Sequence, residues 1–292
     1  MKISAPFPYF GGKSLIADEV WRRFGNPKYY IEPFFGSGAA LLARPSPPRE
    51  EIVNDIDGFI ANFWRAMSKD AAAVAQWADY PINEIDLYAR HGWLIGVKSE
   101  LVTRMESDPE YYDAKIAGWW VWGLSQWIGK EWCGEKRHRR IPLLTHHCGV
   151  HQKTLSTGLL DYFTLLQQRL RRVSVCCGDW KRVIAWQGSP EEVCAIFLDP
   201  PYADTKRGDV YSHEAYTLGN DVEKWALEYG DDLRRRIALC GYEGNYNMPE
   251  SWTCVAWKAP GGYGNRGKEN PNRFRERVWF SPNCLNPAPT LF

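Results

Sequence analysis

Short apolar runs separated by helix-like segments most constrain the fold of this chain. The runs lie near both ends of the sequence, at residues 29–31, 51–53, 173–177, 193–198, 236–240, 252–257 and 277–280. Several are apolar on both faces, as strands are when helices cover both sides of a sheet. The helix-like segments between them are 14–24, 39–42, 57–67, 180–186 and 222–235. This alternation predicts an α/β fold with a doubly wound, mostly parallel sheet of seven strands.

The middle of the chain has a different pattern. No clear strand-like run lies between Ser68 and Arg172, whereas segments 71–77, 110–128 and 155–170 have helical patterns. Residues 116–128 are apolar nearly all round, which is typical of a buried helix. We therefore expect an α/β core of residues 1–67 and 172–292, interrupted by a mainly helical insertion of residues 68–171.

The composition is that of an ordinary folded protein, with 45% hydrophobic and 24% charged residues. A wholly disordered chain or a collagen-like rod is excluded. We expect no membrane span and no secretory signal, because no long apolar stretch is present. Seven of the fifteen tryptophans fall in the insertion at helical spacing, which favours packing over base stacking.

The eight cysteines include no CxxC pair. This usage indicates reduced thiols in a cytoplasmic protein. Four of the cysteines lie inside strand-like runs, and we expect these to be mostly buried: Cys176, Cys194, Cys240 and Cys254.

A glycine-containing turn follows the first strand-like run, where residues 31–38 read IEPFFGSG. Gly36 and Gly38 let the backbone turn tightly and approach a ligand, although an ordinary turn between strand and helix has the same pattern. Asp55 ends the next run and suits the hydroxyls of a ribose. Asp57 is better explained as the cap of the following helix.

The sequence FLDPPY at residues 197–202 carries the sharpest chemical signal. Pro200 and Pro201 remove two backbone donors and stiffen the turn, while their carbonyls remain acceptors. Asp199 and the Pro200 carbonyl can then accept both hydrogens of an exocyclic amine, and Tyr202 offers a face for the base. The alternative is an ordinary turn at the end of a strand, in which the two prolines only end the strand and have no catalytic role.

Together these motifs resemble those of the Dam-type DNA adenine-N6 methyltransferases. The segment PFPYFGGKS at 6–14, the glycine turn and DPPY follow one another in the alpha order of that family. The final ERVWFSP at 276–282 resembles the family's last strand. The resemblance covers about residues 6–65 and 172–282. It implies a Rossmann-like methyltransferase sheet that binds S-adenosyl-L-methionine, with target recognition in the insertion.

The resemblance also implies residue roles. Tyr9 and Lys13 would lie over S-adenosyl-L-methionine, although Lys13 can also be a helix-start lysine or a phosphate contact. Asp55 would take the ribose hydroxyls, and Asp179 would lie near the cofactor adenine. The expected cofactor-binding set is Tyr9, Phe10, Gly11, Gly12, Lys13, Glu32, Pro33, Phe34, Gly36, Ser37, Gly38, Asp55, Ile56, Asp179, Trp180 and Asp199.

The expected reaction is metal-free methyl transfer to the N6 amine of an adenine flipped out of DNA. The expected catalytic residues are Asp199, Pro200, Pro201 and Tyr202. Direct, in-line transfer requires that the amine lone pair be freed and aligned. Cytosine-N4 methylation uses the same amine chemistry and is the nearest alternative. A DNA-binding homologue that has lost catalysis is another.

Basic charge is concentrated in two segments, although the whole chain carries only +1. Residues 130–153 hold six Lys or Arg against two Glu, and residues 258–277 also sum to +4. Such side chains suit phosphate contacts, and a solvated basic loop is the alternative. The candidate DNA-binding residues are Lys130, Lys136, Arg137, Arg139 and Arg140. Histidines and cysteines share the first segment, but their spacing fits no standard zinc site.

We expect a cytoplasmic, bacterial or phage-encoded monomer acting on double-stranded DNA, either alone or beside a cognate restriction nuclease. The family's usual recognition hairpin is not evident, and residues 122–129 read WGLSQWIG instead, so a GATC target cannot be assumed. Residues 203–220 are expected to form a loop that closes over the flipped base. Residues 261–268 are expected to form a second loop.

Overall fold

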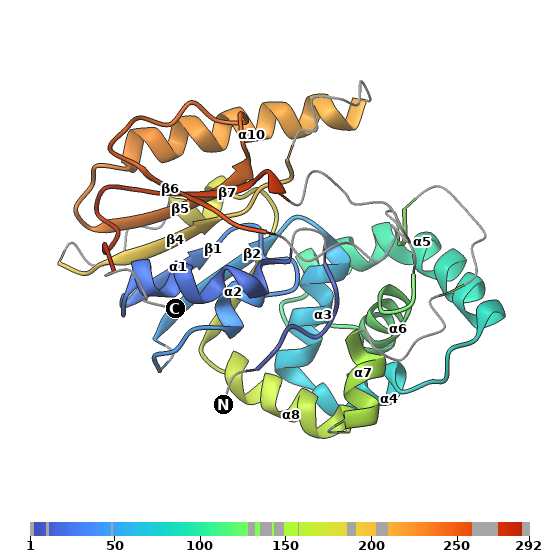
Figure 1. Cartoon of the computed structure of the whole chain (residues 1–292). Coiled ribbons are helices and arrows are strands. Elements are labelled where there is room, and N and C mark those ends of the chain that lie inside the picture. The colour runs from blue at the N-terminus through green and yellow to red at the C-terminus, as the bar shows by residue number, and fades with distance from the viewer. Residues whose placement is uncertain are drawn as a thin grey trace.

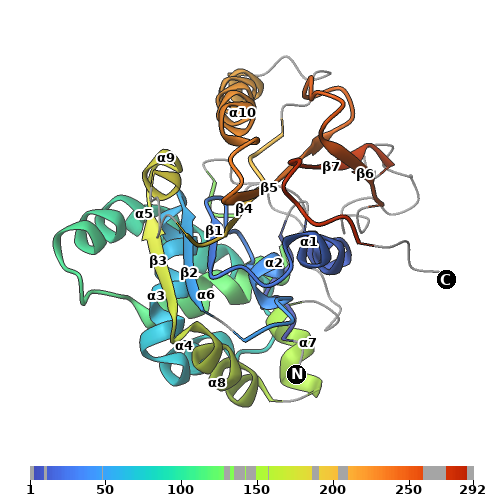
Figure 2. The same cartoon turned by 90° about the vertical axis from the view of Figure 1, so that its left-hand side faces the viewer.

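The fold is that of a single twisted sheet with helices on both faces, and it confirms the predicted α/β class (Figures 1 and 2). The computed structural model describes residues 3–9, 12–47, 49–127, 132–134, 142, 149–156, 158–185, 191–202, 210–258 and 274–287. The seven strands are β1 (Tyr29–Glu32), β2 (Glu50–Asp55), β3 (Val173–Cys177), β4 (Cys194–Leu198), β5 (Arg235–Tyr242), β6 (Thr253–Ala256) and β7 (Glu276–Phe280).

The sheet order is β3-β2-β1-β4-β5-β7-β6, and β7 runs in the direction opposite to that of the other six strands. The chain leaves β1 for β2 on one side, and β4 later returns to pair with the other side of β1. Parallel sheets bind ligands outside the carboxyl ends of the strands, where the strand order reverses in this way. The segments that follow β1 and β4 therefore border one crevice.

Helices cover both faces of this sheet (Figure 2). Those on one face are α9 (Lys181–Ile184) and α10 (Val210–Tyr229), and their core includes Ile196 and Val222. The opposite face packs against η1 (Lys13–Leu15), α1 (Ala17–Phe24), α2 (Ala39–Leu42) and α3 (Gly58–Lys69). Strand β4 is buried along its whole length, which explains its uninterrupted apolar sequence.

The central part of the chain is helical, as its pattern predicts. Its helices are α4 (Ala71–Ala78), α5 (Glu84–Ser107), α6 (Ala114–Leu124), α7 (Gly149–Ser156) and α8 (Leu159–Leu170). They share one hydrophobic core with the sheet. Phe7 from the amino-terminal segment joins the two parts, since its ring lies 5.4 Å from Phe63 of α3 and 5.0 Å from Trp120 of α6. The proposed boundaries near residues 67 and 172 stay a prediction.

The sequence pattern missed α5, a helix of 24 residues. Its buried side chains include Leu87, Leu94 and Leu101, which are seven residues apart and form only a narrow stripe. The other positions mix charged residues with exposed apolar ones such as Ile85 and Trp93, and this mixture masks the helical period. The side chain of Asn83 caps the helix by accepting hydrogen bonds from the backbone of Ile85 and Asp86.

Four other helix predictions were wrong at their boundaries. The predicted 14–24 helix divides into η1 and α1, and the predicted 155–170 helix divides at Gly158, whose φ is +79°. The 110–128 helix begins only at Ala114, because the Asp113 side chain caps its first turn. Helix α10 covers 210–229 rather than 222–235, so residues 210–220 are helical and do not form the predicted loop.

The cysteine and tryptophan side chains that were expected to be buried are only partly so. Cys194 and Cys240 are buried, but Cys254 is exposed because β6 lies at the edge of the sheet. Trp120 and Trp122 are buried in the helical part, whereas Trp93 is 39% exposed. None of the helices among the described residues is long and apolar enough to cross a membrane.

Candidate active site

The carboxyl ends of β1, β2 and β3 are joined by one buried side chain. Asn54 of β2 donates hydrogen bonds from Nδ2 to the Pro33 carbonyl after β1 and to the Gly178 carbonyl after β3, both at 3.0 Å. The Phe35 backbone nitrogen in turn donates to the Asn54 carbonyl. These bonds hold the three predicted cofactor segments side by side at the crevice.

The turn after β1 requires glycine at two positions. Gly36 and Gly38 have φ of +48° and +68°, in the left-handed region that side chains disfavour. A Cβ atom would lie 2.6 Å from the Tyr9 ring at Gly36 and 2.8 Å from the Phe35 ring at Gly38. Trp64 of α3 also holds the turn in place, because its indole nitrogen donates a hydrogen bond to the Gly36 carbonyl at 3.0 Å. The glycine pattern therefore reflects close approach as well as a tight turn.

The Asp55 carboxylate stands at the centre of this crevice and accepts two backbone hydrogen bonds. Gly36 donates to Oδ2 at 2.9 Å and Asp57 donates to Oδ1 at 3.0 Å. Burial raises the pKa of Asp55 to about 6, although these backbone hydrogen bonds act in the opposite direction. The next side chain, Ile56, is 79% exposed and presents an apolar surface at the same edge. Asp57 caps α3 through the Phe59 nitrogen, as predicted.

The remaining predicted cofactor residues divide into exposed and buried groups. Asp179 is exposed beyond β3 and accepts a hydrogen bond from the Lys181 nitrogen at 2.8 Å. The Trp180 ring is buried and lies 5.9 Å from that of Phe34. Glu32 is also buried, and burial raises its pKa well above the usual range while the Tyr30 hydroxyl donates to it. Ser37 and Pro33 are buried within the turn, and Phe10 and Gly11 lie outside the described residues.

Lys13 makes a contact that the sequence did not predict, and its expected place over the cofactor stays a prediction. Its ammonium group lies 2.9 Å from Oδ1 of Asp199, and its side chain is 4% exposed. The same Oδ1 accepts a hydrogen bond from the Tyr202 hydroxyl at 2.8 Å. Burial lowers the pKa of Lys13, but attraction to Asp199, with smaller effects of Cys240 and Glu276, outweighs it and raises the pKa. Lys13 therefore contacts the DPPY carboxylate, which no sequence-based interpretation included.

Aromatic rings surround this ion pair. The Lys13 ammonium lies 5.3 Å from the centre of the Tyr202 ring and 5.6 Å from that of Trp257. Tyr242 of β5 packs edge-on against Tyr202 at 4.8 Å. Pro200 is buried and Pro201 is exposed. Tyr242 and Trp257 carry no functional signal in the sequence, because both stand at the ends of strand-like runs and look like packing residues.

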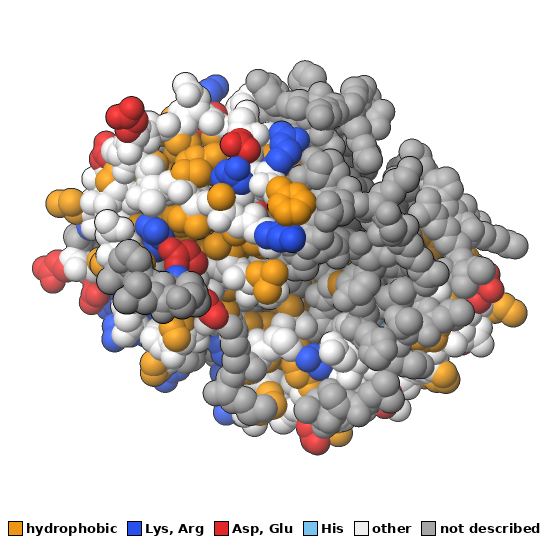
Figure 3. All heavy atoms as spheres, viewed as in Figure 1, with side chains coloured by type: hydrophobic (Ala, Val, Ile, Leu, Met, Phe, Trp, Pro, Cys, Tyr) orange, Lys and Arg blue, Asp and Glu red, His pale blue; other side chains and the backbone are white. Residues whose placement is uncertain are grey.

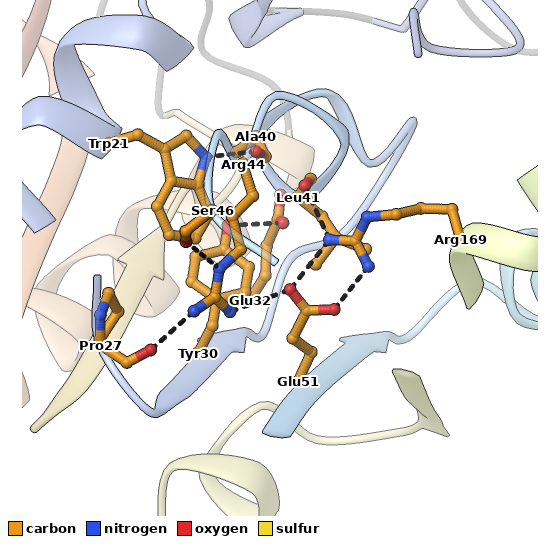
Figure 4. Close-up of polar contacts among 10 residues, drawn as sticks. All are labelled: Trp21, Pro27, Tyr30, Glu32, Ala40, Leu41, Arg44, Ser46, Glu51 and Arg169. Carbon is orange, nitrogen blue, oxygen red and sulfur yellow. Dashed lines mark hydrogen bonds and ion pairs between the residues drawn. The ribbon is translucent and has the colours of Figure 1, made fainter. Parts of the chain in front are cut away.

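A buried ionic cluster contacts α2, the helix that follows the glycine turn (Figure 4). Glu51 at the start of β2 accepts hydrogen bonds from Arg44 after α2 and from Arg169 of α8. Arg169 also donates to the carbonyl of Leu41, the next-to-last residue of α2. The cluster thus attaches α2, which follows the glycine turn, to the last helix of the insertion. Sequence reasoning missed all three of these side chains.

The candidate DNA-binding residues cannot be placed against this site. Lys130, Lys136, Arg137, Arg139 and Arg140 all lie outside the described residues, as do residues 203–209 and 261–268. Over the described part of the face in Figure 3, acidic and basic side chains are interspersed rather than gathered by sign. The DNA-binding role of the basic segment stays a prediction.

Residues 9–102 match the model of the D12 class N6 adenine-specific DNA methyltransferases. The match confirms the predicted family. The matched stretch contains Lys13, the glycine turn and Asp55, and it ends before DPPY. A search of curated proteins found no match. An enzyme of this D12 class methylates adenine in DNA at N6, and the seven-stranded sheet with Asp199 at the end of β4 suits that chemistry.

Proposed function

We propose that this D12 class enzyme transfers a methyl group directly from S-adenosyl-L-methionine to N6 of an adenine flipped out of double-stranded DNA. The observation that carries the proposal is the fixed Asp199 carboxylate. It stands at the carboxyl end of β4, next to the crevice formed after β1 and β2, and Lys13 and Tyr202 both hold its Oδ1.

The crevice has the features that S-adenosyl-L-methionine requires. Gly36 and Gly38 bring the backbone close to a ligand without a Cβ in the way, and Asp55 has remaining lone pairs for ribose hydroxyls. Ile56 supplies an exposed apolar side chain for a flat ring, and Asp179 lies beyond the neighbouring strand. When bound, the cofactor supplies an electrophilic methyl group on a sulfonium centre.

Asp199 orients the target amine in this proposal. Lys13 and Tyr202 both contact its Oδ1, which fixes the orientation of the carboxylate. Oδ2 and the Pro200 carbonyl then accept one amine hydrogen each, which draws the nitrogen lone pair out of the ring and toward the methyl group. Fixed acceptors of this kind also stabilise the positive charge that develops on the nitrogen. The amine proton leaves after methyl transfer, so Asp199 need not be a strong base.

Base flipping follows from the geometry of duplex DNA, because a stacked base cannot present its amine to a crevice in a protein. Extrusion costs a few kcal/mol, and stacking of the flipped base on Tyr202 offsets part of this cost. Contacts with DNA phosphates come from the insertion and its basic segment in this proposal. Cytosine-N4 methylation remains chemically equivalent at Asp199, but the family match favours adenine.

Transfer of labelled methyl groups to unmodified DNA, followed by nucleoside analysis, tests this function. We expect N6-methyladenine as the product. N4-methylcytosine would identify the alternative base, and the absence of transfer to any DNA would refute the proposal.

The variant Asp199→Ala tests the assigned role of the carboxylate. We expect it to abolish transfer while the protein still folds, although the unfolding midpoint should fall because the buried Lys13 ammonium loses its partner. Asp231→Ala, at an exposed position away from the crevice, is the matched control and should retain full activity. Near-normal turnover of Asp199→Ala would overturn the role.

We further propose that the enzyme acts as a monomer, either alone or beside a restriction nuclease. Light scattering of the purified protein tests the first point. Long-read methylation mapping of DNA from expressing cells identifies the recognition sequence.

A further inference from the structure

A second carboxyl group lies buried beside the DPPY site. Glu276 begins β7 and is 3% exposed, and its Oε2 has no hydrogen-bond partner among the described residues. The backbone holds this residue in place: its register partner is Tyr242, whose ring packs on Tyr202, and its carbonyl accepts a hydrogen bond from the Trp257 nitrogen at 3.2 Å. A buried carboxyl oxygen without a partner is costly and therefore needs an explanation.

Several charged and titratable groups act on Glu276. Burial raises its pKa to about 7, while Lys13 and the Tyr202 hydroxyl lower the pKa and Asp199 raises it. Glu276 in turn contributes to the raised pKa values of Lys13, Tyr202 and Cys240. The charged and titratable groups around Glu276 come from three other parts of the fold and from its own neighbours in sequence. They are Lys13 of η1, Asp199 and Tyr202 after β4, Cys240 and Tyr242 of β5, Glu243 directly after β5, and Arg275 and Arg277 on either side of Glu276.

The charge balance of this cluster bears on catalysis. Lys13 alone would neutralise Asp199, and a neutral ion pair stabilises a developing positive charge on the target amine less well than a free carboxylate does. An ionised Glu276 near Lys13 returns the buried cluster of Lys13, Asp199 and Glu276 to a net charge of −1. Protonation of Glu276 brings the same cluster to zero.

We propose that Glu276 is a positioning residue that offsets the charge of Lys13, so that Asp199 can stabilise the cationic target amine during methyl transfer. The inference rests on the function proposed above and extends it to a residue on another strand. Methyl transfer should then be faster when Glu276 is ionised, and its rate should rise with pH through the range near pH 7.

Single-turnover methylation with saturating cofactor and DNA tests the proposal. At pH 8 we expect Glu276→Gln to slow transfer roughly tenfold, less than the hundredfold effect of removing a direct contact, because Glu276 acts through Lys13. At pH 6 the difference from the unmodified enzyme should shrink, since Glu276 of the unmodified enzyme is then largely protonated and, like glutamine, uncharged. Glu276→Asp should keep part of the rate and an inflection in the pH profile.

Glu243→Gln is the matched control. Glu243 directly follows β5 and binds Arg277 at 2.8 Å, with its own side chain 66% exposed. Its substitution should leave the rate and the pH profile unchanged. Difference infrared spectra of the protein without substrates give an independent measurement: a carboxyl group that titrates near pH 7 should be present in the unmodified enzyme and absent from Glu276→Gln.

Two results would overturn the inference. The first is a Glu276→Gln enzyme with the unmodified rate and pH profile. The second is a loss that is equal at every pH and accompanied by weaker cofactor or DNA binding, which would indicate a purely structural role. If Glu276→Gln fails to fold, the infrared titration of the unmodified enzyme decides, and a flat carboxyl signal near pH 7 counts against the proposal. Absence of methyl transfer by the unmodified enzyme would instead refute the proposed function.

Discussion

The buried cluster around Glu51 predicts that one substitution far from the reacting atoms strongly destabilises the protein. The side chains of Glu51 and Arg44 are fully buried and that of Arg169 is 12% exposed. Arg44 donates to Glu51 at 3.0 Å, and Arg169 donates to both carboxylate oxygens at 2.6 and 2.9 Å (Figure 4). Glu51→Gln keeps the size of the side chain but leaves two buried guanidinium groups without their counterion.

The expected loss follows from the cost of an uncompensated buried charge. Removing one partner of a buried ion pair costs about 3–5 kcal/mol, far more than the pair itself contributes. Unfolding entropy near the midpoint is about 2.1 cal/mol/K per residue, or roughly 0.6 kcal/mol/K for 292 residues. The midpoint temperature should therefore fall by about 5–8 °C, as measured by scanning calorimetry.

The control is Glu110→Gln, which removes the same chemical group from the surface. Glu110 binds Lys69 at 2.6 Å, but their side chains are 78% and 41% exposed. Exposed pairs of this kind contribute at most about 1 kcal/mol, so the midpoint should move by less than about 2 °C. Equal midpoints for Glu51→Gln and Glu110→Gln would refute the reasoning, because burial would then make no difference.

Two further predictions concern the cofactor crevice. Gly36→Ala should weaken binding of S-adenosylhomocysteine in titration calorimetry, because its φ of +48° and the Tyr9 ring 2.6 Å from the new Cβ displace the turn. Gly92→Ala, where the new Cβ meets open space inside a helix, should bind normally and gain up to about 1 kcal/mol of stability. Asp55 has a pKa of about 6, raised from 3.8, so the folded protein takes up a proton between pH 6 and 4 that the unfolded chain does not. The destabilising effect of ionised Asp55 is thus present above pH 6 and disappears toward pH 4. With Asp55 in its proposed role at the ribose hydroxyls, cofactor binding should weaken below pH 6, where the carboxylate becomes protonated. Asp55→Asn should remove this pH dependence, and an unchanged pH profile in that variant would contradict the assignment.

Local sequence patterns predicted most of the sheet. Strand β3 was predicted at its exact bounds and β4 and β7 within one residue, because apolar runs bounded by turn residues depend on neighbouring residues alone. Helix α5 was missed because its buried leucines form only a narrow stripe. The first half of α10 was missed because its sequence is largely polar and ends in Gly219 and Asn220, which are typical of loops. The Asn83 cap and tertiary contacts hold α5 in place of a broad amphipathic pattern.

The sequence by itself determined the family and the strand–turn segments, and it carries the prediction that Asp199 orients the target amine. Each of these follows from residue types at short spacing and from the order of the segments along the chain. Only the tertiary structure decided where Lys13 acts. It lies 186 positions before Asp199 and reaches it because β4 returns to pair with β1 at the point where the strand order reverses. Glu276 reaches the DPPY site through other pairings, because β7 pairs with β5 and β5 pairs with β4. No local pattern could reveal either contact, because the energy of a buried charge depends on which distant groups share its surroundings.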